Sequence, residues 1–440
     1  MMRLSNYEDD GLARVEKWLL QQEKTLTTNT LRAILATYNV SFVLEGINRW
    51  HSTMLCELKN SYVQQSQRYV TMSADGYLLP ELTAEEKQQA EKLLQQAFAL
   101  YSAMSVIKEE FKGRPKAEYY EYGIPVEDAR YILPLAMQTN LSVAMSGDKL
   151  LDWFALFAKD SYQNLFVEIK EALLACLPEK VGQVCLAYGI KDEDELQISS
   201  FYQDDLAQIT TAEPVVYLHG FAEPELKAGL GALTSTMAKA PSEVLAGWGE
   251  EWQEKSAAVV GRVLGYGHDS IAEQARTTYG LMFSLVTYHQ QVRHRLPNMY
   301  RENWQDLLAD STRSVIVPPT VAESKFKEDY LALCAAFRQF QQQLAAAYAD
   351  GRWMYFLLNC QQVKVVMSSN ARMDCQMLRE RICRNAQWEI RNIAERKLDL
   401  LRQKSDILYK NALPSCVYGA CKEGAYTCGQ AGAMREKYSK

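Results

Sequence analysis

The sequence predicts an α/β protein, of the α+β type, whose two halves repeat one plan. With 440 residues, of which 48% are apolar, the chain can bury large cores, and a prior of about 100–200 residues per domain indicates two or three domains. Similar segments also recur in the same order. Leu58 aligns with Arg295 at an offset of 237 (295 minus 58), and Pro80 aligns with Pro318 at an offset of 238 (318 minus 80).

The first half contains a predicted strand and a predicted long helix. Residues 39–46 alternate in polarity as a half-buried strand does. Pro80 then precedes a capping box at 83–86, in which the side chains of Thr83 and Glu86 would accept hydrogen bonds from N–H groups at the start of a helix. The helix after this box carries apolar side chains at three- and four-residue spacing, which predicts one buried face: Leu94, Phe98, Tyr101 and Met104.

The second half repeats this order. Residues 281–288 form an apolar run that can pass through a core, and a second capping box is predicted at 320–323. Segments 140–148 and 363–372 correspond at an offset of 224 (370 minus 146), so we expect a shorter loop in the second half. Residues 180–254 are predicted to form a connector with a helical insert. The helix after the second box has one apolar stripe: Phe326, Tyr330, Leu333, Phe337, Phe340 and Leu344.

Charge and composition argue against several classes of protein. The net charge of −6 and the pI near 5.6 argue against a general nucleic-acid binder, which needs a basic excess to displace counterions from phosphates. Residues 1–10 carry acids where a secretory leader has its apolar core, and no apolar run reaches the ~20 residues of a membrane span. We therefore expect a cytoplasmic protein without membrane or nucleic-acid partners, whose ten cysteines are mostly reduced.

A basic segment at 290–295 follows the apolar run of the second half. Arg293 and Arg295 flank His294, and each guanidinium can bind a phosphate or carboxylate through two hydrogen bonds at once. We expect His294 to switch between donor and acceptor near neutral pH. Such a segment suits a site for phosphorylated, electron-rich ligands, and a solvated basic turn is the alternative. The Gly-Leu-Gly at 229–231 does not predict a dinucleotide loop, because a preceding strand and a third glycine are missing.

Several motifs together resemble those of the flavin-dependent thymidylate synthases. They are Gly-His-Asp-Ser-Ile-Ala-Glu at 267–273, the basic segment at 290–295, Asn-Ala-Arg at 370–372 with Arg381 after it, and Ala-Gln-Trp-Glu-Ile-Arg at 386–391. The resemblance implies two tandem copies of that family's fold, an antiparallel sheet flanked by long helices. We divide the chain into a first repeat (25–179), the connector (180–254), a second repeat (255–412) and a cysteine-containing tail (413–440).

Each half lacks what the other retains. The family's signature is Arg-His-Arg, two residues, Ser, and then Ser-x-Arg, and the second half keeps only its start. The first half has 56–58 (Cys-Glu-Leu) in place of Arg-His-Arg but keeps the Ser-Gln-Arg at 66–68. Asp-Ala-Arg survives only at 128–130, and Asn-Ala-Arg only at 370–372. Members of the family are homotetramers that bind their nucleotide between subunits, so we expect a homodimer with composite sites built from both repeats.

The resemblance assigns roles to individual residues. It implies FAD-dependent conversion of dUMP to dTMP, with methylenetetrahydrofolate, a folate, as carbon donor and NADPH as electron donor. Arg293 and Arg381 are the expected catalytic residues, because fixed positive charge stabilises electron density that moves when the uracil ring is attacked. The expected substrate-binding residues are Gln64, Ser66, Gln67, Arg68, Arg130, Gln290, Arg293 and Arg381. The expected FAD-binding residues are His268, Ser270, Glu273, His294, Arg295, Asn370, Arg372 and Asn385.

Alternatives remain at single positions and for the whole chain. Gln274 and Asn385 stand where many family members carry histidine, Ser270 and Glu273 could be helix caps, and Asn370 could be a turn former. We interpret Trp388 as a core residue. The rival functions are a relative that transfers another one-carbon group to a pyrimidine nucleotide, and a non-catalytic nucleotide-binding paralogue.

The tail raises the question of a metal. Zinc favours four soft ligands, and the tail supplies three thiols near a fourth. These four cysteines are a candidate zinc site, with reduced thiols in a solvated tail as the alternative: Cys383, Cys416, Cys421 and Cys428.

Overall fold

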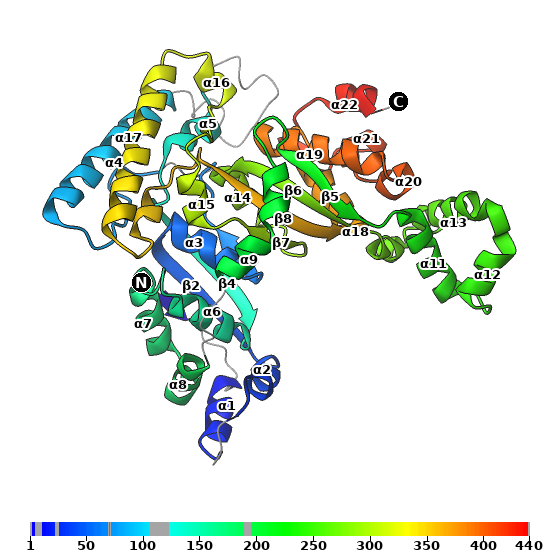
Figure 1. The fold of residues 1–440 in the computed structure, drawn as a ribbon, viewed down its shortest axis with the longest axis horizontal. Helices are drawn as coiled ribbons and strands as arrows, with labels where there is room; N and C mark the ends of the chain where they lie inside the picture. The colour runs from blue at the N-terminus through cyan, green and yellow to red at the C-terminus, as the bar shows by residue number, and fades with distance from the viewer. Residues whose placement is uncertain are drawn as a thin grey trace.

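The protein is built around two four-stranded antiparallel sheets, as a computed structural model shows (Figure 1). The structure describes residues 2–4, 11–22, 26–68, 70, 72–105, 123–188 and 195–438. The first sheet has the order β1-β2-β4-β3 and the second has the order β5-β6-β8-β7. The strands are β1 (Met2–Leu4), β2 (Asn39–Asn48), β3 (Ser61–Gln64), β4 (Gln138–Ser146), β5 (Val215–Gly220), β6 (Arg276–Ser284), β7 (Asn298–Arg301) and β8 (Gln362–Asn370).

The strands reproduce the offsets that were read from the sequence. β3 and β7 are 237 positions apart (298 minus 61), whereas β4 and β8 are 224 positions apart (362 minus 138). The two sheets have the same strand order and antiparallel pairing, and β3 and β7 lie at equivalent edges. The predicted duplicated α+β fold is therefore confirmed.

Helices flank both sheets, and the pairs α4 and α17, α3 and α14, and α6 and α18 hold corresponding places in the two halves. The helices of the first half and connector are α1 (Gly11–Leu19), α2 (Thr28–Leu35), α3 (Arg49–Cys56), α4 (Ala84–Met104), α5 (Val126–Ala129), α6 (Lys149–Ala158), α7 (Val167–Cys176), α8 (Glu179–Ala187), α9 (Glu195–Phe201) and α10 (Gln203–Gln208). Those that follow are α11 (Pro224–Thr236), α12 (Pro241–Trp248), α13 (Trp252–Gly265), α14 (Leu285–Gln291), α15 (Trp304–Ala309), α16 (Pro319–Ala322), α17 (Lys327–Ala347), α18 (Ala371–Arg381), α19 (Trp388–Arg402), α20 (Asp406–Tyr409), α21 (Ser415–Tyr418) and α22 (Ala431–Tyr438).

The two predicted capping boxes have different outcomes. At α4 the box is present, with Thr83 accepting from the Glu86 N–H and the Glu86 carboxylate accepting from the Thr83 N–H. The second box is wrong. Thr320 lies inside the short helix α16, because Pro319 occupies the first helical position, and its hydroxyl donates instead to Asp128 Oδ2 at 2.8 Å. The long helix α17 begins later, at Lys327, and still buries most of the predicted stripe.

The two halves join through a contact that is nearly symmetric. Pro134 and Leu358, which are equivalent positions (358 minus 134 is 224), form an antiparallel bridge. The Leu135 N–H donates to the Leu357 carbonyl at 2.7 Å, and the Asn359 N–H donates to the Leu133 carbonyl at 2.9 Å. α4 also packs on α17, and the two helices run side by side in Figure 1. The halves therefore meet as two copies do in a two-fold dimer.

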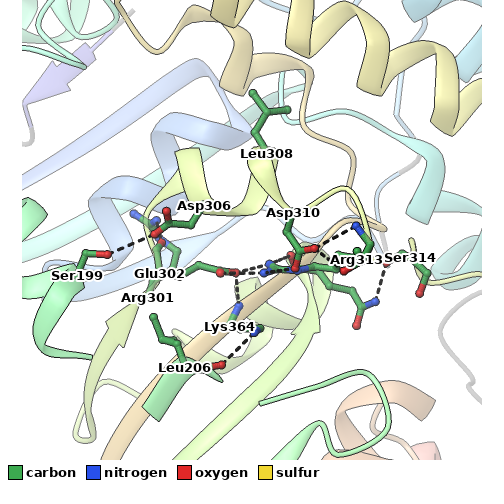
Figure 2. Close-up of polar contacts among 12 residues, drawn as sticks. Ser199, Leu206, Arg301, Glu302, Asp306, Leu308, Asp310, Arg313, Ser314 and Lys364 are labelled. Atoms are coloured by element: carbon green, nitrogen blue, oxygen red, sulfur yellow. Dashed lines mark hydrogen bonds and ion pairs between the residues drawn. The ribbon is translucent and has the colours of Figure 1, made fainter. Parts of the chain in front are cut away.

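The segment between the halves is not all linker. β5 pairs with β6 of the second sheet, and α10 packs on β8. Lys364 Nζ on β8 donates to the Leu206 carbonyl of α10 at 2.9 Å (Figure 2). Residues 229–231 lie inside α11, so they form no phosphate-binding loop. The chain divisions at 179, 254 and 412 stay a prediction. Within the described residues, no helix combines the length and apolar character needed to cross a bilayer.

Candidate functional site

The basic segment of the second half lies against the edge strand of the first half. α14 ends at Gln291, and Arg293 then donates from Nε to the Gln64 side-chain oxygen at 3.4 Å. Arg295 donates to the Tyr62 carbonyl in β3. Residues from both halves line a cavity of about 200 Å³ here: Cys56, Tyr62, Val63, Gln64, Val292, Arg293 and Arg295.

The Ser-Gln-Arg loop of the first half contacts the second half in turn. Arg68 Nη2 donates to the Asn385 carbonyl at 3.1 Å, and its Nε pairs with the Glu127 carboxylate at 2.7 Å. Gln67 is buried, and its side-chain oxygen accepts a hydrogen bond from Asn359 Nδ2 at 3.2 Å. Within one chain, therefore, the loop at 66–68 and the segment at 290–295 each touch the opposite half.

Arg130 lies buried behind this loop. Its Nε donates to the Glu127 carbonyl at 3.2 Å, and its own carbonyl accepts from Asn359 Nδ2 at 3.0 Å. Burial and the nearby Arg68 guanidinium lower the pKa of Arg130 to about 10. Its Nη2 and the Gln67 Nε2 are buried donors without a hydrogen-bond partner among the described residues. Buried polar groups are normally paired, so these two donors mark a place for an acceptor from outside the chain.

Guanidinium groups from both halves gather around this place. Burial and the nearby Arg293 and Arg68 lower the pKa of Arg381 to about 10, although the neighbouring Glu380 opposes the shift. Burial, together with Arg293 and Arg130, lowers the pKa of Arg49 to about 9. All these groups stay protonated at neutral pH. Mutual repulsion between buried cations is relieved by an anion, so the cluster is suited to a phosphorylated ligand.

His294 does not behave as the sequence suggested. Burial, together with Arg381 and other nearby cations, lowers its pKa to about 3. Arg381 Nε donates to His294 Nε2 at 2.7 Å, so Nε2 is an acceptor and the proton of the neutral ring is on Nδ1. The expectation that this ring switches near neutral pH is therefore wrong, because a cationic imidazole would be desolvated beside a guanidinium.

The remaining predicted cofactor residues fall into two groups. Asn385 lies near the arginine cluster, where its Nδ2 donates to the Tyr426 carbonyl and its buried Oδ1 lacks a partner among the described residues. His268, Ser270 and Glu273 are exposed at the 3₁₀ helix η4 (Asp269–Gln274), and Arg372 on α18 pairs with Glu273. The α18 helix, of 11 residues and about 16 Å, separates Arg372 from Arg381.

Asn370 is a helix cap rather than the turn former of its alternative reading, whereas Trp388 packs on the core as expected. Asn370 is the N-cap of α18, where its Oδ1 accepts from the Met373 N–H at 3.0 Å. Trp388 is half-buried against the core and donates from Nε1 to Asp128 Oδ1 at 3.0 Å, across the two halves. Burial and Glu127 raise the pKa of Asp128 to about 7. Asp128 therefore joins the halves through Trp388 and Thr320.

The equivalent place on the other side of the molecule is a cavity of about 440 Å³ whose lining includes an ion pair between Glu57 and Arg301. Glu57, which stands where the second half has His294, pairs with Arg301 at 2.8 Å and accepts from the Tyr288 hydroxyl at 2.6 Å. The Arg301 guanidinium lies 3.9 Å from the centre of the Trp304 ring, which is fully buried. Trp304 corresponds to Gln67 (304 minus 67 is 237), so a buried indole ring stands where the first half has a buried amide.

The chain after Arg301 is held by a second buried ion pair. Arg313 binds the Glu302 carboxylate and also pairs with Asp310 at 3.2 Å (Figure 2). The Lys364 N–H donates to Glu302 Oε1 at 2.7 Å. The Glu302 carboxylate thus binds both Arg313 and the backbone of β8, whereas the corresponding loop of the first half carries Arg68. On this side, therefore, Arg301 and Arg313 are each paired with a carboxylate of the chain itself.

The zinc prediction is not supported. The described residues contain no group of three or more His, Cys, Asp or Glu side chains that could hold a metal ion. All ten cysteines are free thiols. Burial, together with the neighbouring thiols of Cys421 and Cys428, raises the pKa of Cys416, which favours the protonated form over a thiolate ligand.

Sequence reasoning missed three residues that shape the site. Arg49, Glu127 and Asn359 bond to the loop at 65–68 or to Arg130, and Arg49 and Asn359 sit in stretches without a recognisable motif. The only available signal was for Glu127, which precedes the Asp-Ala-Arg at 128–130. Arg49 and Asn359 become visible only when the halves are packed together.

Comparisons with known proteins match both halves. A profile of the Thy1 family, described as thymidylate synthase complementing protein, matches residues 10–180 and 226–405. The flavin-dependent thymidylate synthase of Clostridium tetani is 27% identical over 208 residues, which cover 42% of this chain and 82% of that protein. The enzyme of the same name from Geobacter sulfurreducens is 29% identical over 188 residues, covering 41% of this chain and 80% of that protein.

A solved structure also matches part of the chain. It is the flavin-dependent thymidylate synthase of Helicobacter pylori complexed with FAD and dUMP, with a TM-score of 0.36 and 16% sequence identity. The match covers 45% of this chain and 99% of that chain.

Proposed function

Because this chain belongs to the Thy1 family of flavin-dependent thymidylate synthases, we propose that it methylates dUMP to dTMP at composite sites, each built from both halves of one chain. One observation carries this proposal. Arg68 of the first half donates to the Asn385 carbonyl of the second, while Arg293 of the second donates to Gln64 of the first. The two partial motifs thus share one location.

The phosphate of dUMP binds on the first-half side in this proposal. Arg68, the Ser66 hydroxyl and Arg130 supply charged and neutral donors, and hydrogen bonds from charged donors to phosphate are stronger than neutral ones. The buried Nη2 of Arg130 and Nε2 of Gln67 have no partner among the described residues, so the nucleotide would satisfy them. The Arg68–Glu127 pair holds the guanidinium at the edge of this site beforehand.

The uracil ring binds on the second-half side. Gln290 is buried near the end of α14 and can hydrogen-bond the ring carbonyls, whereas Arg293 and Arg381 place positive charge beside it. Charge that is fixed before the reaction stabilises the electron density that develops on the ring when it is attacked. His294 stays neutral and accepts from Arg381, so it keeps that guanidinium oriented.

FAD fits the residues around this site. His294, Arg295 and Asn385 lie beside the arginine cluster, and the buried Oδ1 of Asn385 lacks a partner among the described residues. The other expected contacts lie at the start of α18 and on η4: His268, Ser270, Glu273, Asn370 and Arg372. When bound, reduced FAD would supply the hydride, with methylenetetrahydrofolate giving the carbon and NADPH the electrons.

We propose that a second copy of the chain covers part of the cofactor. The Glu273 and Arg372 side chains are 45% and 44% exposed, although they belong to the expected cofactor set. A homodimer of duplicated chains would provide the four repeat units that the family's homotetramer has. Because Glu57 and Arg301 pair with each other at the equivalent place in each chain, we expect such a dimer to bind two dUMP molecules rather than four.

The test is direct. Purified protein loaded with FAD is incubated with dUMP, methylenetetrahydrofolate and NADPH, and dTMP is measured together with dUMP binding per chain. The proposal expects dTMP and one dUMP per chain. Bound dUMP without dTMP would favour a relative that transfers another one-carbon group, and a colourless protein that takes up no FAD would favour a non-catalytic paralogue.

A further inference from the structure

Arg49 is a buried cation that no motif explains. It is the first residue of α3, after the N-cap Asn48, and is 1% exposed. Its N–H donates to the Met137 carbonyl at 2.8 Å, which fixes the start of α3 to the end of the first sheet. Its side chain therefore leaves from a fixed point and reaches into the interface between the halves.

The guanidinium of Arg49 bonds to both walls of the proposed dUMP site. Its Nη1 donates to the Gln65 carbonyl at 3.1 Å, directly before the loop at 66–68. Its Nε donates to His289 Nδ1 at 3.2 Å, and His289 directly precedes Gln290 in α14. One side chain thus joins the backbone of the phosphate-side loop to the helix that carries the uracil-side residues.

The second of these bonds belongs to a closed network. Because His289 Nδ1 accepts from Arg49, the ring proton is on Nε2, which contacts the Thr53 hydroxyl. Thr53 Oγ1 in turn donates to the Arg49 carbonyl at 2.8 Å. Burial and the nearby Arg49 hold the pKa of His289 well below its usual range, so the ring stays neutral. Every group of the network then has one defined role, which rigidifies it.

Two further observations connect Arg49 to the site rather than to general stability. Among the described residues, no carboxylate is a main influence on the charge of Arg49, although an unpaired buried charge is costly. The equivalent first residue of α14 is Leu285 (285 minus 49 is 236), which is fully buried. The chain therefore carries this arginine only on the side where the parts of the dUMP site are complete.

We propose that Arg49 is a positioning residue that holds the loop at 66–68 in register with α14, so that the phosphate and uracil walls fit one nucleotide. This inference rests on the proposed function and adds a residue to it. Arg49 needs a forked donor for this role, because its two bonds leave from Nε and Nη1 in different directions. A lysine keeps the charge but not the fork.

The experiment compares Arg49→Met and Arg49→Lys with the wild type. The dUMP dissociation constant is measured by equilibrium dialysis on FAD-loaded protein, with the flavin content per chain and the melting temperature as further readouts. We expect both variants to weaken dUMP binding by about tenfold or more, the loss of one hydrogen bond to a charged group. We expect the flavin content to match that of the wild type.

A control and a second variant keep the test decisive. Arg352→Met removes another arginine of the interface, which pairs with Asp350 at 2.8 Å, and should leave dUMP binding at the wild-type level. If Arg49→Met does not fold, His289→Leu removes the acceptor and should still weaken dUMP binding.

The outcomes separate this inference from the function it rests on. Wild-type affinity in Arg49→Met or in His289→Leu would overturn the inference, and so would full recovery in Arg49→Lys, because charge alone would then suffice. A wild-type protein that binds no dUMP would instead contradict the proposed function.

Discussion

Replacing Arg68 with alanine should weaken dUMP binding by removing contacts to the phosphate. Arg68 is held by Glu127 at 2.7 Å and donates to the Asn385 carbonyl at 3.1 Å, so it is placed before any ligand arrives. In the proposed complex it makes two charge-assisted hydrogen bonds to phosphate. At about 1.5 kcal/mol each, their loss amounts to about 3 kcal/mol, or about 150-fold in the dUMP dissociation constant.

The structure adds a second effect to this loss. The Glu127 side chain is 8% exposed, and without Arg68 its negative charge stays buried beside the phosphate. The double variant Arg68→Ala/Glu127→Gln should therefore bind dUMP more tightly than Arg68→Ala alone. Arg32→Ala, which breaks an ion pair with Asp152 in the first half, is the matched control and should leave dUMP binding unchanged.

The assay is isothermal titration of FAD-loaded protein with dUMP, with the melting temperature measured in parallel. The reasoning is refuted if Arg68→Ala binds dUMP within threefold of the wild type while remaining folded. It is also refuted if the double variant binds dUMP more weakly than the single variant, because Glu127 would then be a favourable contact for the nucleotide.

Two further predictions concern His294 and the Glu57–Arg301 pair. The pKa of His294 is about 3 in the folded protein and near 6.5 in the unfolded chain, so the unfolded state takes up more protons between these values and stability is lost as the pH falls below 6.5. His294→Gln should lose part of this acid sensitivity in chemical unfolding curves between pH 4 and pH 7, and an unchanged slope would contradict the burial of a neutral ring. Arg301→Met leaves Glu57 without its partner and should destabilise the fold by about 3 kcal/mol, while one dUMP still binds per chain. A stoichiometry of two dUMP per chain, in that variant or in the wild type, would show that the side with the Glu57–Arg301 pair also forms a site.

The duplicated fold was predictable because the same strand and helix signals occur in the same order in both halves. Strand and helix signals recur at fixed offsets, and those offsets of 237 and 224 residues reappear in the strands. The second capping box failed because the short helix begins at Pro319, two residues earlier than predicted, and the Thr320 hydroxyl bonds to Asp128 of the other half. A local motif could not reveal that long-range partner.

The candidate site was predictable in its residue types but less so in its electrostatics. The motifs at 66–68 and 290–295 indicated two partial sites, but only the packing of the halves brings Arg68 and Arg293 to the same location within one chain. The low pKa of His294 depends on burial beside Arg381, which is 87 positions away. Arg49 follows a strand without any motif, so only its contacts with Gln65 and His289 identify it.

Mixing two inactive variants tests most directly whether each site is built within one chain. Arg68→Ala and Arg293→Ala chains are unfolded together, refolded as a mixture, and assayed for dTMP formation against each variant refolded alone. We expect no recovery, because every chain lacks one of the two arginines of its own site. Recovery to about a quarter of the wild-type activity, as expected for randomly mixed dimers whose sites form between chains, would contradict this expectation.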